Sequence, residues 1–468
     1  MPETWAISLN MRTEKLRVLL TVLLCTLLLC GCASGLPERD EKEASPAQTE
    51  ETGQSETKKT EELKKESEEI SEAGEPDEDR EEKAVSEDAS TAEEADVNED
   101  PETEEQAMTE EPEEKSPEAA ASEDPEVLSV LENMSLEARV AQMFVLLPEQ
   151  LTGMGQVTEA GDVTRAALES FPVGGLLYID GSLESYEQTK ALLADTQQIS
   201  RETTGLPMLT FVDEEGGIVT RISGRFPEVP WIESMAAYGA RGSEEEAYQT
   251  GQAMGSYLAD LGFTCDCAPV ADVLTNPDNY VIGERSFGSD PELVAGMAAA
   301  LGKGLESEGV TAVYKHFPGH GGTAEDTHEG YASLERTKEE LYACDLVPFI
   351  SAIENGAKII MAAHITLPNI TEEDLPASLS PEILTGLLRG ELGYDGLIIT
   401  DALNMGAVAN QYTSAEAAVM AVRAGADMIL MPADPFSAYQ AVLDAVYSGE
   451  ITPERIDESV LRILKLKL

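Results

Sequence analysis

Eight short runs of apolar and β-branched residues recur along the chain after residue 139, and most of them are followed by a longer segment with helical spacing. Short runs of this kind between turn signals are typical of buried strands, whereas apolar positions three and four apart are typical of helices that face a core. The eight predicted strands span residues 140–147, 173–179, 207–213, 263–270, 309–316, 357–365, 396–402 and 426–432.

The order of these elements predicts the fold class. Strands and helices alternate without a further set of strands, which indicates an α/β fold with a parallel sheet, most simply a (β/α)8 barrel of the TIM type. Two predicted helical segments, residues 245–262 and 380–393, end at glycine, as helices often do. A doubly wound open sheet is the alternative, but no G-x-G-x-x-G pattern follows the first strand.

The N-terminal residues have a different pattern. A basic stretch precedes the apolar run VLLTVLLCTLLLCGC, an arrangement typical of an export signal. The end of this run resembles the lipobox of bacterial lipoproteins, which implies that residues 1–31 are a signal peptide and that Cys32 is lipidated. Cys30 stands where that family usually has Ala or Ser. A plain secretory signal or an uncleaved anchor helix is the alternative.

Residues 32–126 form a predicted disordered linker between this signal and a globular domain at residues 127–468. Residues 37–126 hold 37 acidic and nine basic side chains and no aromatic residue. Such a segment buries too little apolar surface to offset its ordering entropy, and its charges repel one another. Roughly 90 residues of flexible chain reach about 50 Å, so we interpret the segment as a spacer.

Charge and cysteine content narrow the possible functions further. The formal net charge is −59, and the globular part keeps a large acidic excess. Phosphate binding needs a basic face, so we expect no nucleic-acid partner. Beyond Cys32, only Cys265, Cys267 and Cys344 remain, which match neither a disulfide framework nor a zinc motif. We expect Cys265 and Cys267 to pack in the core.

Polar residues follow several of the predicted strands, where the active site of such a barrel lies. Asp213, Lys315, His316, His364 and Asp401 end strands, and Arg285 and His328 lie in the loops after the fourth and fifth strands. These side chains come from five strand–loop segments and are expected to converge on one rim.

A metal site is one reading of the histidines in KHFPGHGGTAEDTH, residues 315–328. His316 and His320 have the spacing of two ligands on a helix, but Pro318 and the surrounding glycines oppose a helix. A metal held by Asp213, His316 and Asp401 remains an alternative.

The second reading is a glycosidase that uses a carboxylate nucleophile and a separate acid/base group. Asp401 ends an apolar strand, where an unpaired carboxylate is costly without a role. His328 has an ordinary pKa of about 6.5 and suits an acid/base. Asp326, two residues earlier, is placed to orient its ring. Asp401 as a helix N-cap and His320 as a structural residue are the plainer alternatives.

Four motifs together resemble glycoside hydrolase family 3, in particular its β-N-acetylhexosaminidase branch. They are DEEGGIVTR (213–221), NPDNYVIGERSFGSDP (276–291), KHFPGHGGTAEDTH (315–328) and GYDGLIITDALNMGAV (393–408). The resemblance covers roughly residues 128–468. It implies Asp401 as nucleophile, His328 as acid/base and Asp326 as its partner. The substrate-binding residues it implies are Asp213, Arg221, Arg285, Lys315 and His316. No cofactor or metal is implied.

The resemblance also implies an activity, namely retaining hydrolysis of terminal β-linked N-acetylhexosamine. Together with the lipobox it suggests a monomeric enzyme, anchored by lipid at the extracellular face of a bacterial membrane, that acts on peptidoglycan fragments. A β-glucosidase or β-xylosidase of the same family and a catalytically silent sugar-binding lipoprotein are the alternatives. The sequence ends where the family's barrel domain ends, which favours the histidine loop over the domain that supplies a glutamate acid in β-glucosidases. Transfer of the sugar to phosphate stays open.

Overall fold

The computed structural model describes residues 124–324, 327, 330 and 332–468, and their strands form one parallel barrel. The strand order is β10-β1-β2-β3-β4-β5-β7-β9, with every neighbouring pair parallel. The strands are β1 Phe144–Leu146, β2 Gly175–Leu177, β3 Leu209–Val212, β4 Cys265–Asp266, β5 Thr311–Phe317, β7 Ile359–Ala362, β9 Leu397–Thr400 and β10 Ile429–Leu430. The (β/α)8 prediction is therefore confirmed.

The barrel closes between β9 and β10, where the structure has an isolated bridge and backbone hydrogen bonds rather than a regular ladder. The amide of Thr400 donates to the carbonyl of Met428 at 3.1 Å, and the amide of Met428 donates to the carbonyl of Ile398 at 3.0 Å. An isolated parallel bridge pairs Ile399 with Met428. This line between β9 and β10 is referred to below as the seam.

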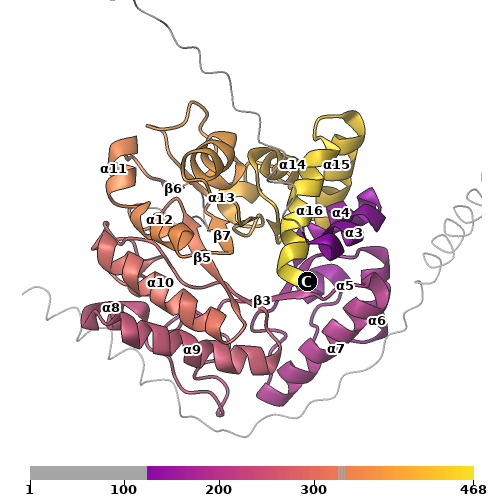
Figure 1. Ribbon diagram of the computed structural model, residues 1–468, viewed down its shortest axis with the longest axis horizontal. Coiled ribbons are helices and arrows are strands. Elements are labelled where there is room, and N and C mark those ends of the chain that lie inside the picture. Colours follow the sequence, from indigo (N-terminus) through magenta and orange to yellow (C-terminus); the bar gives the residue numbers. More distant parts are fainter. Residues whose placement is uncertain (1–123, 325–326, 328–329, 331) are drawn as a thin grey trace, which may run out of the picture. The chain divides into compact units, whose positions relative to one another are not determined.

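Helices form a ring around the strands (Figure 1). The α-helices are α3 Pro125–Asn133, α4 Leu136–Gln142, α5 Pro148–Thr152, α6 Asp162–Ser170, α7 Tyr186–Thr204, α8 Met235–Arg241, α9 Glu244–Leu261, α10 Pro291–Ser307, α11 Lys338–Ala343, α12 Val347–Glu354, α13 Gly406–Ala409, α14 Ser414–Ala424, α15 Pro435–Ser448 and α16 Pro453–Lys467. Two 3₁₀ segments, η2 Gly283–Arg285 and η3 Ala377–Leu379, and the π-helical η4 Glu382–Glu391 complete the set. None of the helices in the described part of the chain is both long and apolar enough to cross a membrane.

The helix ends follow local sequence signals. The hydroxyl of Ser243 accepts a hydrogen bond from the amide of Glu246 and begins α9, and Gly262 ends that helix with a φ of 102°. A left-handed φ of this kind costs glycine little, because it has no Cβ. The predicted helix at residues 380–393 likewise stops before Gly393, at a φ of 66°.

Two expectations about the elements need correction. Residues 140–142, predicted as the start of the first strand, belong to α4, because the helical spacing that begins after Ser135 continues through Gln142. A second pair of strands was not expected, yet β6 Ala332–Ser333 and β8 Ile365–Thr366 form a small parallel sheet. It connects the loop after β5 to the chain after β7, beside the carboxyl end of the barrel.

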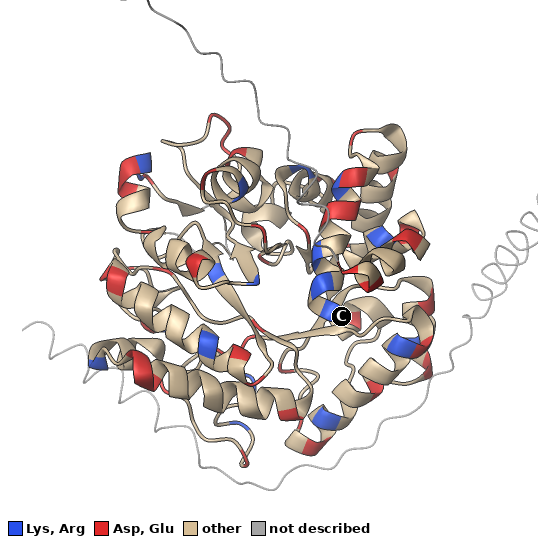
Figure 2. Cartoon of the chain, viewed as in Figure 1, with Lys and Arg blue, Asp and Glu red and all other residues tan. Residues whose placement is uncertain are grey.

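Charged residues are spread unevenly over this scaffold. Acidic residues lie on outer helices all around the barrel, whereas α16 carries a row of basic residues (Figure 2). The core between strands and helices is apolar, and Phe144 and Phe317 pack there against Tyr439 of α15 and Phe349 of α12. Burying a side chain of this size contributes about 1.5–3 kcal/mol.

Candidate active site

A cavity of about 360 Å³ opens where the strands end. Its walls come from β2, β3, β4, β5, β7, β9 and β10 or from the loops that follow them. Six of the predicted site residues line it, namely Asp213, Arg221, Arg285, Lys315, His316 and Asp401. Five of the seven side chains expected to converge on the rim therefore do so, and Arg221, expected from the family resemblance alone, joins them; the chemical roles of all six remain predictions.

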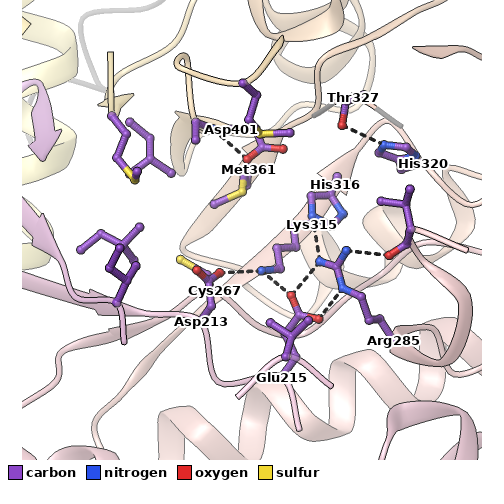
Figure 3. A pocket seen from close by; sticks show the side chains of 18 of the residues that line it. Asp213, Glu215, Cys267, Arg285, Lys315, His316, His320, Thr327, Met361 and Asp401 are labelled. Atoms are coloured by element: carbon purple, nitrogen blue, oxygen red, sulfur yellow. Dashed lines mark hydrogen bonds and ion pairs between the residues drawn. The ribbon is translucent and has the colours of Figure 1, made fainter. Parts of the chain in front are cut away.

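Four charged side chains of the cavity form one ionic network, here called the site cluster: Asp213, Glu215, Arg285 and Lys315 (Figure 3). The Nζ of Lys315 lies 2.9 Å from Asp213 Oδ1 and 2.6 Å from Glu215 Oε1. Arg285 donates from Nε and Nη2 to both oxygens of Glu215, at 2.7 and 2.8 Å. This bidentate contact fixes the orientation of the guanidinium plane.

Burial and charge pairing set the ionisation of this cluster. Burial alone would raise the pKa of Glu215, but Arg285 and Lys315 outweigh it and lower that pKa below its usual range. Burial would likewise lower the pKa of Lys315, yet Asp213 and Glu215 raise it above its usual range. Glu215, Arg285 and Lys315 are therefore charged at neutral pH.

Glu215 was not among the predicted site residues; it lies in EEGG at residues 214–217, a composition typical of a turn. The turn exists, since Gly216 and Gly217 have φ values of 85° and 58°. The signal that could have revealed Glu215 is its position two residues after Asp213, on a chain leaving the strand. Its side chain is 1% exposed and would be too costly to bury without its two cations.

A second buried glutamate places Arg221. The carboxylate of Glu214 accepts hydrogen bonds from the amides of Arg221 at 2.7 Å, Ile222 at 2.9 Å and Ser223 at 2.7 Å. The hydroxyl of Tyr257 on α9 donates to the same carboxylate at 2.9 Å. The loop after β3 is therefore folded around this carboxylate, and Arg221 reaches the cavity wall from it.

His316 is oriented by a carboxylate that sequence reasoning also missed. Its Nδ1 lies 2.7 Å from Asp272 Oδ2. Burial would raise the pKa of Asp272, but His316 lowers it below its usual range, so the carboxylate is ionised. It accepts a hydrogen bond from the N–H group at Nδ1. The Nε2 atom then faces Arg285 Nη2, at 3.4 Å, as an acceptor. We assign this tautomer from the hydrogen-bond network.

Asp401 lies directly after β9 and is half-buried at the cavity. Its Oδ1 accepts a hydrogen bond from the amide of Ala402 at 2.8 Å. Burial would raise the pKa of Asp401, but His364 and His316 lower it below its usual range. The N-cap alternative is wrong, because Met405 occupies that position of the next helix, α13.

His364, expected on the rim, does not line the cavity but lies behind it. It is fully buried, with Nδ1 2.7 Å from Ser378 Oγ and Nε2 3.0 Å from the carbonyl oxygen of Ala402. Its ring therefore supports the backbone of the residue that follows Asp401.

The loop after β5 starts with tightly packed glycines. A Cβ on Gly321 would lie 2.1 Å from the carbonyl oxygen of Val273, and Gly319 has a φ of 128°. These two glycines are required for close packing and backbone conformation. The predicted acid/base pair, Asp326 and His328, lies outside the described residues.

The structure shows where Cys265 and Cys267 lie and how the possible metal ligands are arranged. Cys265 and Cys267 are buried free thiols, as expected, and Cys267 also lines the cavity beside the site cluster (Figure 3). Within residues 124–324, 327, 330 and 332–468, no group of three or more His, Cys, Asp or Glu side chains is arranged to hold a metal ion. The alternative metal set of Asp213, His316 and Asp401 is not supported by that geometry.

Comparisons with known proteins agree with this site. Residues 136–466 match the family described as "Glycosyl hydrolase family 3 N terminal domain". The chain is 32% identical to Beta-hexosaminidase A of Pseudoalteromonas piscicida over 64% of this chain and 54% of that protein. It is 34% identical to Beta-hexosaminidase LpqI of Mycobacterium tuberculosis over 66% of this chain and 79% of that protein.

A solved structure is similar as well. The family 3 β-N-acetylglucosaminidase from Paenibacillus sp. str. FPU-7 superposes with a TM-score of 0.67 at 41% identity. The alignment covers 71% of this chain and 62% of that one. The chain thus spans only about half to two thirds of the length of two of these three relatives.

Proposed function

The chain belongs to glycosyl hydrolase family 3, and from this premise we propose that it is a retaining exo-β-N-acetylhexosaminidase. The observation that carries the proposal is a single cavity that combines an ionised carboxylate, Asp401, with a fixed array of sugar-binding donors and acceptors. A volume of about 360 Å³ suits one sugar unit, as an enzyme that removes terminal residues requires.

The site cluster provides the contacts for that sugar. Asp213 is 22% exposed and has oxygen lone pairs available to hydroxyl donors, while Arg285 and Lys315 donate to hydroxyl or acetamido oxygens. Because Glu215 holds both cations, their positions are set before the sugar binds, and little entropy is lost on binding. The preference for an N-acetylated sugar rests on the hexosaminidase names of the relatives.

The chemistry proceeds in two displacements. An oxygen of Asp401 attacks the anomeric carbon while the bond from that carbon to the leaving oxygen breaks. The electron pair of that bond goes to the leaving oxygen, which takes a proton from His328. Water then attacks the glycosyl ester, His328 removes its proton, and Asp401 leaves as the carboxylate. Asp326 orients the ring of His328; for both residues the proposal rests on sequence alone.

A panel of p-nitrophenyl glycosides tests this function. We expect turnover of the β-N-acetylglucosaminide and little turnover of the β-glucoside or β-xyloside. Turnover of the β-glucoside alone would favour another member of the family, and no turnover of any glycoside would favour a sugar-binding protein. NMR of the first product should show the β-anomer, since an α-anomer would contradict retention. Comparing phosphate with a zwitterionic buffer separates hydrolysis from transfer to phosphate.

The proposal extends to location and natural substrate. Residues 1–31 would be removed and Cys32 acylated at the extracellular face of a bacterial membrane, with residues 32–126 as a spacer. A monomeric barrel on such a spacer would reach N-acetylglucosamine-containing fragments of the cell wall. In a bacterial host the full chain should partition into the detergent phase, and Cys32→Ser should not, whereas Cys344→Ser in the barrel should behave as wild type. Equal partitioning of Cys32→Ser would contradict the lipid anchor.

A further inference from the structure

His320, the histidine without a role in the proposed reaction, makes hydrogen bonds with both of its ring nitrogens. Its Nδ1 lies 2.8 Å from Thr323 Oγ1, and its Nε2 lies 3.3 Å from Thr327 Oγ1 (Figure 3). All three side chains are nearly inaccessible, with exposures of 0–2%. The ring therefore bridges two points of the loop after β5 that are four residues apart in the sequence.

The protonation state fits this bridging role. Burial is the main influence on the pKa of His320 and lowers it, against the opposing effect of Asp272. A neutral imidazole has one donor and one acceptor, and a threonine hydroxyl can serve either. Both ring nitrogens are therefore satisfied without a charge.

The main chain of His320 is held by two further side chains, Asp272 and Asn279. Its amide donates to Asp272 Oδ1 at 2.6 Å, and its carbonyl accepts from Asn279 Nδ2 at 2.8 Å. Asp272 is the same carboxylate that holds the His316 ring. The start of the loop is thus rigidly connected to a residue of the sugar pocket.

Thr327, at the other end of the bridge, also contacts the segment that carries the nucleophile. The amide of Ala407 donates to the carbonyl of Thr327 at 3.0 Å. Ala407 lies in α13, six residues after Asp401. Thr327 is therefore held between the His320 ring and the segment after β9.

We propose that His320 is a positioning residue for acid/base catalysis, acting through Thr327. Thr327 lies between Asp326 and His328 in the sequence, so fixing its side chain and its carbonyl restricts where the two neighbouring residues attach relative to Asp401. Proton transfer requires the acid within hydrogen-bond reach of the leaving oxygen, and an error of about 1 Å costs up to about 10²-fold in rate. The inference rests on the proposed function, because it needs His328 as the acid.

The prediction that separates this role from a purely structural one concerns the leaving group. Acid assistance matters most when the departing oxygen is a poor leaving group and little when it is an activated phenol. Loss of the His320–Thr327 contact should therefore lower kcat/KM selectively for poor leaving groups, whereas a general loss of folded protein would lower it equally for all substrates.

The test compares Thr327→Val, Thr327→Ser and Thr250→Val on 2,4-dinitrophenyl and methyl β-N-acetylglucosaminides. Thr250 is a matched control, because its buried hydroxyl donates only to the carbonyl of Glu246 within α9, outside the cavity. We expect Thr327→Val to lose about tenfold more kcat/KM on the methyl glycoside than on the dinitrophenyl glycoside. Thr327→Ser, which keeps the hydroxyl, and Thr250→Val should show no such selectivity.

Two further variants make the outcomes distinguishable. His328→Ala should show the same selectivity more strongly. The double variant His320→Gln/Thr327→Val should have a kcat/KM no lower than that of the less active single variant, because both substitutions remove the same contact. No turnover by wild type would overturn the proposed function itself, and a non-selective His328→Ala would overturn the acid role. A selective His328→Ala with equal losses in Thr327→Val would overturn the present inference alone.

Discussion

Two ionic clusters at opposite ends of the barrel use buried charge in different ways. The site cluster has two cations and two carboxylates around a cavity. The second, here called the seam cluster, has three arginines, Arg389, Arg455 and Arg462, around the single carboxylate of Asp427. Asp427 lies just before β10, beside the seam with β9.

The contacts of the two clusters explain the difference. In the seam cluster Asp427 is fully buried, and it also accepts hydrogen bonds from the amide of Ile398 at 2.9 Å and the hydroxyl of Ser459 at 2.7 Å. Its arginines also donate to backbone carbonyls, such as that of Ala426. Most of these bonds join separate elements, such as α16 and the chain before β10. In the site cluster Asp213 remains partly exposed to the cavity, available to a ligand.

We infer that the seam cluster stabilises the closed barrel and that the site cluster prepares a binding surface. Charge balance is the physical distinction. An excess of cations at the seam is tolerated because the arginines, 15–23% exposed, reach solvent. At the cavity, where burial is more complete, each cation needs its own carboxylate. Four predictions test this separation of stability from function.

The largest effect is expected at the nucleophile. Asp401→Asn should lower kcat/KM by about 10⁴-fold or more, because the replacement amide cannot form the glycosyl ester. The free energy of unfolding in urea should fall only slightly, because the lowered pKa of Asp401 indicates that its ionised carboxylate contributes some stability to the folded protein. A loss of stability as large as that expected for Asp427→Asn would show that Asp401 also stabilises the barrel, and would weaken the proposed separation of stability from function.

Asp427→Asn should have the opposite profile. Removing the shared carboxylate leaves three arginines without their partner, so we expect the free energy of unfolding to fall by roughly 3 kcal/mol. The activity of the folded fraction should change less than about threefold. Urea denaturation with a parallel assay at low temperature measures both quantities. A large drop in kcat at unchanged stability would argue that the seam cluster influences the site.

Glu215→Gln should affect both quantities moderately. The amide keeps the shape but loses the charge that orients Arg285 and Lys315, so kcat/KM should fall by about 10²-fold. Stability should fall by about 1–3 kcal/mol, because two buried cations lose a partner. Glu137→Gln on the exposed face of α4 is the matched control, and should leave kcat/KM unchanged. A neutral outcome at Glu215 would contradict preorganisation of the sugar pocket.

The smallest effect is in the pH dependence of stability. The pKa of Glu215 in the folded protein is lowered below its unfolded value of about 4.3. Its stabilising contribution is therefore complete above about pH 4.3 and is lost as pH falls towards the folded value. The free energy of unfolding of Glu215→Gln should accordingly decline less steeply than that of wild type below pH 4.3. Parallel curves would mean that Glu215 keeps an ordinary pKa.

The sequence by itself determined the barrel and most of its catalytic face. Eight apolar runs alternating with helical spacing are local patterns, and a parallel barrel places every strand end on one face, so Asp213, Lys315 and Asp401 were expected to meet. Each predicted strand begins one to four residues before the observed one, and the first begins inside a helix, because Val140 and Ala141 suit either a helix or a strand.

Only the tertiary structure decided which polar side chains hold those residues. Glu215, Asp272 and Asp427 are ordinary acidic residues in an acidic chain, and nothing in their local sequence distinguishes them from solvated ones. Their cations come from distant segments, as Arg285 and Lys315 do for Glu215. The energy of a buried charge depends on what surrounds it in three dimensions, and not on its neighbours along the chain. The same reason left His320 without a role until its contacts with Asp272 and Thr327 were known.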